Sequence, residues 1–477
     1  MDLIKIRFKL FNLLSLFFLF NLISQIFCLL EFPIKLIDST IIPKYKGYQF
    51  DNKISQHIKN ILNINNISNY TFNNFKNIKF SIESGDINLI TSYLLSIKIE
   101  LGTSNQEFNL ILDTGSTITW VPLINSADLY PIKHHYNPSI SSKSKKLNED
   151  FIIKYGTGSC IGNYYKDEMK YINNKEFDMV FGAAEETIFN VNDVDGIIGL
   201  SRIYDDNFKS FIHMLCRGGI TKSKIFSFKL GLNLTLENPG KFYIGKHGDF
   251  DKDNVARCEM KNSDYYEKNL WACEMSSFSI VNNNDYIKLT SKKKISVIFD
   301  SGTNAIFLPL YYLGQMENDL DKLNCKAIKD SSISSINRYQ LICKGEVPDF
   351  HLVIGGHTFI LPGKYFFYFN QLYASSKIIF QDSFDDGNNL FIIGSPFFML
   401  FHILFDSYSK ELHFYPEKDE FLIKGTWWNS KHIIVVIIFV FIFIAFIILI
   451  VLLILWKRKN LIEIKESYEI TSFYGLL

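Results

Sequence analysis

The sequence Ile-Leu-Asp-Thr-Gly-Ser at residues 111–116 returns as Ile-Phe-Asp-Ser-Gly-Thr at residues 298–303. Each copy is followed, further along the chain, by Ile-Ile-Gly, at residues 197–199 and 392–394. An internal repeat of this kind predicts two half-bodies of similar plan. Each half would give one aspartate, Asp113 or Asp300, to a shared cleft.

An apolar strand that runs into Asp-Ser/Thr-Gly-Ser/Thr suits a pair of facing carboxyl groups. Glycine permits a sharp turn and a close approach of backbone, and the flanking hydroxyls can hydrogen-bond the carboxylates. Two carboxylates in contact cannot both ionise at low cost, so the pair shares one proton. One oxygen then takes a proton from a bound water while the protonated partner donates to a peptide carbonyl. A single copy would more often be an ordinary Asx turn, but two copies with matching downstream segments are specific.

These residues resemble the pepsin-like aspartic proteases (family A1) over roughly residues 90–416. Trp120 stands where that family has a tryptophan that hydrogen-bonds the tyrosine of the flap, a hairpin that closes over substrate. Residues 155–159, Tyr-Gly-Thr-Gly-Ser, match the flap itself. The biased composition is similar to that of plasmepsin-like members of the family.

The resemblance implies a role for each matched residue. The catalytic pair is Asp113 and Asp300, and no cofactor or metal is implied. Tyr155 helps to shape the pocket beside the scissile bond. The further residues expected at the site are Gly156 and Thr157, which bond the substrate backbone; Gly158, Gly115 and Gly302 of the flap and loops; Ser116 and Thr303, which orient the outer carboxylate oxygens; and Thr114 and Ser301, which lock the loops together.

Several positions depart from the family pattern. Ser301 stands where threonine is commoner, and Ser395 follows Gly394 where many members carry aspartate, which leaves the pH optimum open. Residues 121–131 contain no cysteine, although the family often has a short disulfide loop there. Cys160, within the flap, is unusual.

Short alternating stretches punctuated by Gly, Asn and Asp predict a mostly-β body from Tyr93 to about Tyr415. Strands are expected at residues 93–100 and 108–112, joined by a turn at 102–105, and helices only at 208–217 and 310–323. With the resemblance, the expected fold class is mostly β: a bilobal pepsin-like fold with one catalytic Asp loop per lobe, plus a C-terminal transmembrane helix.

The two ends of the chain carry targeting signals. Lys5, Arg7 and Lys9 precede an apolar stretch, the layout of a secretory signal peptide or an uncleaved signal anchor. Residues 433–456 contain no charged side chain, and as a helix they would span roughly 36 Å, enough to cross a bilayer. Lys457-Arg458-Lys459 follows at once and places that end in the cytosol.

The expected divisions follow from these signals. They are a signal peptide or anchor (1–28), a pro-segment (29–85), the protease body (86–416, with lobes of about 86–245 and 246–416), a stalk (417–432), a transmembrane helix (433–456) and a cytosolic tail (457–477). In the pro-segment, Lys76 or Lys79 could lie against the Asp pair, although a loosely ordered linker is the alternative. The last four residues, Tyr-Gly-Leu-Leu, fit a sorting pattern.

The seven cysteines are too few for a disulfide scaffold and lack zinc-like spacing. Cys28 lies in the leader. Cys325 and Cys343 flank a polar stretch and are expected to bridge a loop, and Cys258 and Cys273 bracket a candidate hairpin with its turn at 262–264. Whether Cys160 and Cys216 pair is open. The sequons at Asn66, Asn69 and Asn233 agree with a lumenal or extracellular body.

Charge and composition further restrict the functions that the chain could have. Fifty Lys and Arg against 49 Asp and Glu leave a net charge of +1, with no basic face, so no nucleic-acid partner is expected. The predicted function is an aspartic endopeptidase acting on protein or peptide substrates. Its body is expected to be monomeric and its chain a single-pass type I membrane protein of the secretory or endosomal system or cell surface. The alternative is a catalytically silent membrane binding protein with a pepsin fold.

Overall fold

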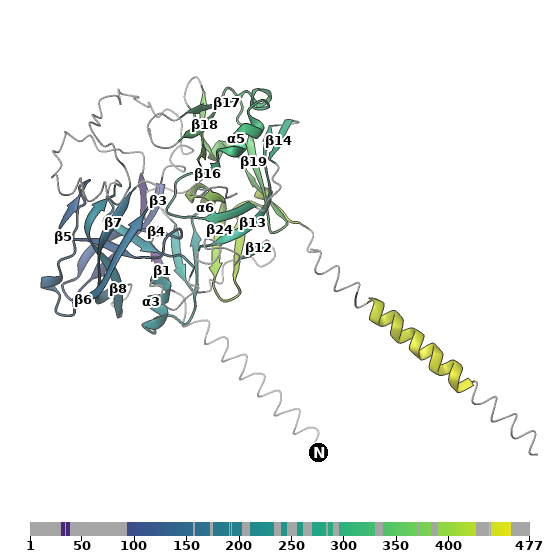
Figure 1. The fold of residues 1–477 in the computed structure, drawn as a ribbon, viewed down its shortest axis with the longest axis horizontal. Coiled ribbons are helices and arrows are strands. Elements are labelled where there is room, and N and C mark those ends of the chain that lie inside the picture. The colour runs from purple at the N-terminus through teal and green to yellow at the C-terminus, as the bar shows by residue number, and fades with distance from the viewer. Residues whose placement is uncertain are drawn as a thin grey trace, which may run out of the picture. The chain divides into compact units, whose positions relative to one another are not determined.

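A computed structural model of the chain describes three β-sheets in one body and a separate apolar helix. In Figure 1 the blue strands of the first sheet gather at the left and the green strands of the second at the upper right. The residues described are 30–33, 35–38, 93–155, 158–171, 175–189, 191, 193–202, 210–232, 240–245, 255–260, 270–282, 285–289, 295–329, 337–369, 373–382, 390–425, 438 and 440–458.

Among the described residues, the first-half sheet has eight strands in the order β2-β3-β4-β9-β5-β8-β7-β6. The predicted turn joins β3 to β4, with positive φ at Gly102 and Asn105, two residue types that adopt such angles at low cost. The strands predicted on either side of it are confirmed. The sheet comprises β2 (Lys35–Asp38), β3 (Tyr93–Leu101), β4 (Gln106–Asp113), β5 (Trp120–Asp128), β6 (Lys145–Lys154), β7 (Ser159–Tyr171), β8 (Lys175–Ile188) and β9 (Gly196–Gly199).

The second-half sheet has twelve strands within the described part of the chain, and the second aspartate loop follows its strand β15. Its main path runs β17-β18-β22-β16-β23-β15-β13-β19-β20-β26, with β14 beside β13 and β21 beside β22. The strands are β13 (Ala272–Asn282), β14 (Asp285–Leu289), β15 (Ile295–Phe299), β16 (Ile306–Pro309), β17 (Cys325–Lys329), β18 (Arg338–Cys343), β19 (Asp349–Ile354), β20 (His357–Leu361), β21 (Phe367–Phe369), β22 (Ala374–Gln381), β23 (Leu390–Ile393) and β26 (Leu422–Ile423).

A central sheet, with six strands in the residues that the structure describes, takes strands from both halves of the sequence in the order β1-β11-β10-β24-β25-β12. Its strands are β1 (Leu30–Pro33), β10 (Ile225–Lys229), β11 (Lys241–Ile244), β12 (Ala256–Glu259), β24 (Phe401–Asp406) and β25 (Glu411–Pro416). Phe226 on β10 stacks on Phe405 of β24 with ring centroids 4.6 Å apart, and Trp271 packs edge-on against both. This aromatic core therefore binds the two halves together.

The two copies of the sequence repeat have the same arrangement of strands in the structure. β4 runs parallel to β9, with Asp113 opposite Gly199, and β15 runs parallel to β23, with Phe299 opposite Ile393. A methyl group at Gly199 would collide with the backbone of Thr117, and one at Gly394 would collide with backbone carbonyls of the Asp300 loop. Each Ile-Ile-Gly segment therefore lies directly beside its own aspartate loop, and the prediction of two halves of similar plan is confirmed.

Among the described residues of the body, helices are few, as predicted. α3 (Phe211–Arg217) lies within the first predicted segment, and the second divides into α5 (Tyr311–Met316) and the 3-10 turn η3 (Leu320–Leu323). α6 (Ser395–Leu400) was not predicted. Proline at its first turn favours a helix start, but all six of its residues are buried, so no polar face marks a helical period.

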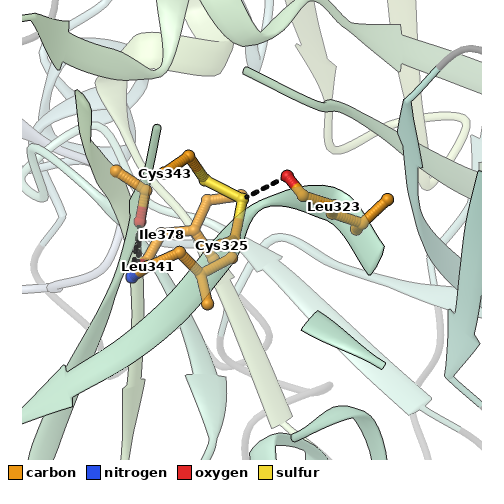
Figure 2. Close-up of a disulfide and its surroundings, with 6 residues drawn as sticks. Leu323, Cys325, Leu341, Cys343 and Ile378 are labelled. Carbon is orange, nitrogen blue, oxygen red and sulfur yellow. Dashed lines mark hydrogen bonds between the residues drawn. A yellow bond between two sulfur atoms is a disulfide. The ribbon is translucent and has the colours of Figure 1, made fainter. Parts of the chain in front are cut away.

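The predicted disulfide between Cys325 and Cys343 is present and joins directly opposed residues of the hairpin β17–β18. Figure 2 shows the bridge beside Leu341 and Ile378, with the Cys325 sulfur 3.2 Å from the backbone carbonyl oxygen of Leu323. Both cysteines are buried. The disulfide therefore closes the hairpin within the apolar interior.

Cys258 and Cys273 are also bonded, and the hairpin predicted between them lies mostly outside the described residues. β12 pairs with β25 in the central sheet, whereas β13 pairs with β14, β15 and β19 in the second-half sheet. This disulfide thus links two sheets, and residues 262–264 lie outside the described residues. Neither Cys160 nor Cys216 forms a disulfide, which answers the question that the sequence left open.

Removing the disulfide between sheets should cost stability. A cross-link that closes a loop of about 15 residues is expected to contribute about 3 kcal/mol, and Cys258 and Cys273 are 15 residues apart. The Cys258→Ala/Cys273→Ala variant should therefore lose about 3 kcal/mol in its free energy of unfolding, measured by urea denaturation. The Cys325→Ala/Cys343→Ala variant is the matched comparison, because these two cysteines are 18 residues apart and close a loop of similar length. An unchanged unfolding midpoint would contradict this expectation.

The body extends beyond Pro416, where the sequence placed the start of a stalk. η5 (Asp419–Phe421) buries Phe421, and β26 then pairs with β20. Residues 417–423 therefore belong to the body, and the predicted stalk boundary is corrected to follow Ile423. Strand addition to an edge of the second-half sheet explains the difference, because pairing of this kind leaves little local signal.

The separate unit contains a helix over Val440–Arg458 that is long and apolar enough to cross a membrane. It overlaps the predicted span 433–456 and ends two residues after it. Several predicted features lie outside the described residues: the signal segment, Lys76 and Lys79, the three sequons and the last 19 residues.

Candidate active site

The two aspartate loops face each other in the body. Asp113 ends β4 and Asp300 directly follows β15. A methyl group at Gly115 would lie 2.6 Å from Cγ of Asp300, and one at Gly302 would lie 2.6 Å from Oδ1 of Asp113. Each glycine thus leaves room for the carboxyl group of the opposite loop.

Reciprocal hydrogen bonds hold the loops together. The backbone N–H of Thr114 donates to Oγ of Ser301 (3.1 Å), and the N–H of Ser301 donates to Oγ1 of Thr114 (2.9 Å). Each hydroxyl in turn donates across the pair, Thr114 to the carbonyl of Phe299 and Ser301 to that of Leu112, at 2.7 and 2.6 Å. All of these groups are buried, so the four bonds fix the position of one loop relative to the other.

Each carboxylate is also held by its own loop. Oδ1 of Asp113 accepts from the N–H of Gly115 (2.8 Å), and Oδ1 of Asp300 accepts from the N–H of Gly302 (2.9 Å). Ser116 donates to Oδ2 of Asp113, and Thr303 donates to Oδ2 of Asp300 at 3.0 Å. Both outer oxygens therefore have a hydroxyl donor, which fixes the planes of the carboxyl groups.

The electrostatics of the pair favour a shared proton. Burial raises the pKa of Asp113 well above its usual value, and the negative charge of Asp300 raises it further, against the opposing effect of Ser116. Burial also raises the pKa of Asp300, while its hydrogen bonds with Asp113, Thr303 and Gly302 lower it. Since two buried carboxylates in contact cannot both ionise cheaply, the pair titrates as a unit.

Tyr155 lies at the end of the flap strands, close to the first loop. Nε1 of Trp120 donates to its hydroxyl oxygen at 2.8 Å, and the hydroxyl lies beside that of Ser116. Burial raises the pKa of Tyr155, so the phenol stays protonated. The N–H of Tyr155 donates to the carbonyl of Gly158 (2.7 Å) across the hairpin turn. The expected substrate contacts Gly156 and Thr157 lie outside the described residues.

Two residues near Tyr155 were not assigned a site role from the sequence. Phe189 packs edge-on against Trp120 at 5.1 Å, and Cys160 is buried in the same small apolar cluster. Burial raises the pKa of the Cys160 thiol, so it behaves as an apolar group. No sequence pattern marked Phe189, while Cys160 stood out only as an unusual residue of the flap.

Ser395, where many family members carry aspartate, lies beside the second loop. It is buried, and its N–H donates to the carbonyl of Thr303 at 2.7 Å. Across the part of the chain that the structure describes, no group of three or more His, Cys, Asp or Glu side chains is placed to hold a metal ion.

The sequence profile of the eukaryotic aspartyl protease family matches residues 92–416, which include both loops and the flap. The chain belongs to this family. It is 27% identical over 330 residues to cathepsin D of Gallus gallus, covering 65% of this chain and 77% of that protein.

Other relatives agree with this assignment. Pepsin A of Suncus murinus is 25% identical over 317 residues, covering 65% of this chain and 77% of that protein. Vacuolar protease A of Aspergillus fumigatus is 25% identical over 275 residues, covering 55% of this chain and 64% of that protein. The aspartyl protease described here is thus, by family, an aspartic-type endopeptidase with a pepsin-like fold.

Proposed function

We propose that this protein is a membrane-tethered endopeptidase in which Asp113 and Asp300 act as one catalytic dyad. The observation that carries the proposal is the mutual placement of the loops, with each glycine against the opposite carboxyl group. Burial of both groups and the raised pKa of each support a dyad that holds one proton.

The arrangement supports hydrolysis by general acid–base catalysis. The ionised carboxylate takes a proton from a water bound between the pair, and the resulting hydroxide forms a bond to the peptide carbonyl carbon. The protonated carboxyl donates its proton to the carbonyl oxygen. In the collapse of the tetrahedral intermediate, the carboxyl that received the water proton passes it to the nitrogen, and the C–N bond breaks to release the amine. The other carboxylate takes a proton from one hydroxyl of the intermediate as the new carboxyl group forms, which restores the starting state of the dyad. Ser116 and Thr303 hold the carboxyl planes throughout, and Tyr155 with Gly156, Thr157 and Gly158 would cover the substrate.

The substrate would be an extended peptide of about six to eight residues, bound as a strand through main-chain hydrogen bonds. The full chain in detergent should cleave a mixed peptide library at pH 4 to 6, and a statine-type transition-state analogue should abolish the cleavage. Absence of cleavage at every pH would favour the alternative, a pepsin-fold membrane binding protein.

The shared proton sets the expected pH dependence. The active form has one carboxyl protonated and one ionised, so activity is lost at low pH when both are protonated. It is lost again as the pH rises through the raised pKa of the dyad, because the general acid is then ionised. Cleavage rates measured between pH 3 and 8 should give a bell-shaped pH profile with its maximum below neutral pH. A flat profile up to pH 8 would contradict the shared proton.

The remaining features support a secretory-pathway topology. The apolar helix Val440–Arg458 would cross the bilayer once, with the basic residues at its end in the cytosol and the monomeric body lumenal or extracellular. Residues 29–85 would act as a pro-segment. β1 and β2, which begin this stretch, add to the edges of the central and first-half sheets.

Membrane attachment is testable by extraction. The full chain expressed in cells should stay with the membrane pellet in alkaline carbonate and enter solution only with detergent. A variant that ends at Gly425 should be soluble, because it retains the whole body but lacks the helix. Release of the full chain by carbonate would contradict a spanning helix.

A further inference from the structure

Asp195 is a buried carboxylate that holds the start of β9. Its side chain is 2% exposed. Its Oδ2 accepts from the backbone N–H of Asn109 on β4 at 2.8 Å, while its own N–H donates to the carbonyl of Asn109, also at 2.8 Å. These two hydrogen bonds between Asp195 and one backbone position set the register of β9 against β4.

That register leads directly to the catalytic loop. From Leu110 opposite Gly196, the parallel pairing continues to Asp113 opposite Gly199. Beyond it, the N–H of Leu200 donates to the carbonyl of Asp113 (2.8 Å) and the N–H of Ser201 donates to the carbonyl of Ser116 (2.9 Å). A shift of β9 would therefore move the backbone on both sides of the first carboxyl group.

His134 completes the coordination of the buried carboxylate. Its backbone N–H donates to Oδ1 of Asp195 at 3.0 Å, and its Nδ1 lies 2.9 Å from Oδ2 and 3.0 Å from Oδ1. Because carboxylate oxygens accept, Nδ1 carries the proton and donates. A buried carboxylate that loses such a donor bears a desolvation cost, which favours its movement toward water.

We propose that His134, acting through Asp195, is a positioning residue for Asp113. The ring holds the Asp195 carboxylate, Asp195 sets the register of β9, and β9 holds the Asp113 loop against the Asp300 loop. The inference rests on the proposed dyad and deepens it, because it names a residue outside the two loops on which their alignment depends.

The neighbouring histidine provides a matched control. Nε2 of His135 lies 2.7 Å from Oδ2 of Asp128, and Asp128 also accepts from Ser126 and Thr187. The pair has the same chemistry as His134 and Asp195, but Asp128 lies at the far end of β5, where the strand pairs with Thr187 of β8. Loss of the His135 ring should therefore leave the dyad aligned.

The experiment compares the full-chain wild type with His134→Ala, His134→Asn and His135→Ala. A tight-binding statine-type analogue first counts the active sites in each preparation, and kcat per counted site is then measured with a peptide substrate. His134→Ala should lower kcat per site between about tenfold and 100-fold, with KM changed less than about twofold, since the first loop is misplaced. His134→Asn, whose amide nitrogen can replace Nδ1 as donor, should recover most of the rate, and His135→Ala should match the wild type.

The outcomes separate positioning from folding. An unchanged kcat per counted site in His134→Ala, with only fewer sites, would overturn the proposal, because His134 would then merely stabilise the body. Failure of His134→Ala to give any countable sites would overturn it for the same reason. If the wild type shows no countable sites and no cleavage, the proposed function and this inference are both refuted. This outcome differs from the others because the defect is present without any substitution.

Discussion

Replacing either aspartate of the pair by asparagine should lower kcat/KM by about 10⁴-fold, because the dyad loses either its base or its acid. Asparagine keeps the shape of the side chain and can still bond the donors around Asp113 and Asp300. The loss should therefore appear in kcat, measured with the same peptide substrate at the pH optimum of the wild type. Retention of a tenth or more of the wild-type rate by either variant would contradict the proposed role of that residue.

Thermal unfolding at neutral pH provides the control for folding. A carboxyl group whose pKa is raised in the folded state stabilises the protein at low pH, and that stability is lost as the pH rises through the raised value. The amide of the Asp113→Asn variant has no charge to bury, so this variant should unfold at pH 7 at the same temperature as the wild type or higher. A large fall in the unfolding temperature would show that the lost activity reflects misfolding.

The second large effect should come from Gly302→Ala. The new methyl group would lie 2.6 Å from Oδ1 and 2.8 Å from Cγ of Asp113, closer than any ordinary contact. The two loops must then separate or rotate, and a displacement of about 1 Å at a reacting group can cost about 100-fold in rate. We therefore expect kcat/KM to fall by about 100-fold or more, measured with the same peptide.

Gly314→Ala is the matched control for this substitution. Gly314 lies in α5, and a methyl group there would meet no atom within 4 Å. Its activity should equal that of the wild type, and its helix should gain slightly in stability. Equal activity of Gly302→Ala and Gly314→Ala would contradict the close approach of the two loops.

The sequence was most informative where chemistry depends on short local patterns. The aspartate loops, their Ile-Ile-Gly partners and the turn between β3 and β4 each need particular residues at fixed spacing, because glycine and hydroxyl side chains have few substitutes there. Cys325 and Cys343 could be paired because they flank one polar stretch a short distance apart. The structure shows how the loops meet, through the reciprocal bonds of Thr114 and Ser301.

Features that depend on distant pairing were not predictable in the same way. The central sheet pairs β10 with β24 and stacks Phe226 on Phe405, although these segments are far apart in the sequence. The local residue pattern of a strand does not indicate which distant strand it will pair with. The same reason explains the misplaced stalk boundary, where β26 adds to β20. No pattern in the sequence marked His134, because its partner Asp195 is distant in sequence.

Binding of a statine-type analogue is the most direct test of one active site built from both loops. Isothermal titration of the full chain in detergent at the pH optimum should give one site per chain. Since hydrogen bonds to charged groups contribute about 1.5–3 kcal/mol, Asp113→Asn and Asp300→Asn should each weaken binding by about 100-fold. Two sites per chain, or an affinity that either substitution leaves unchanged, would contradict a single dyad formed by Asp113 and Asp300.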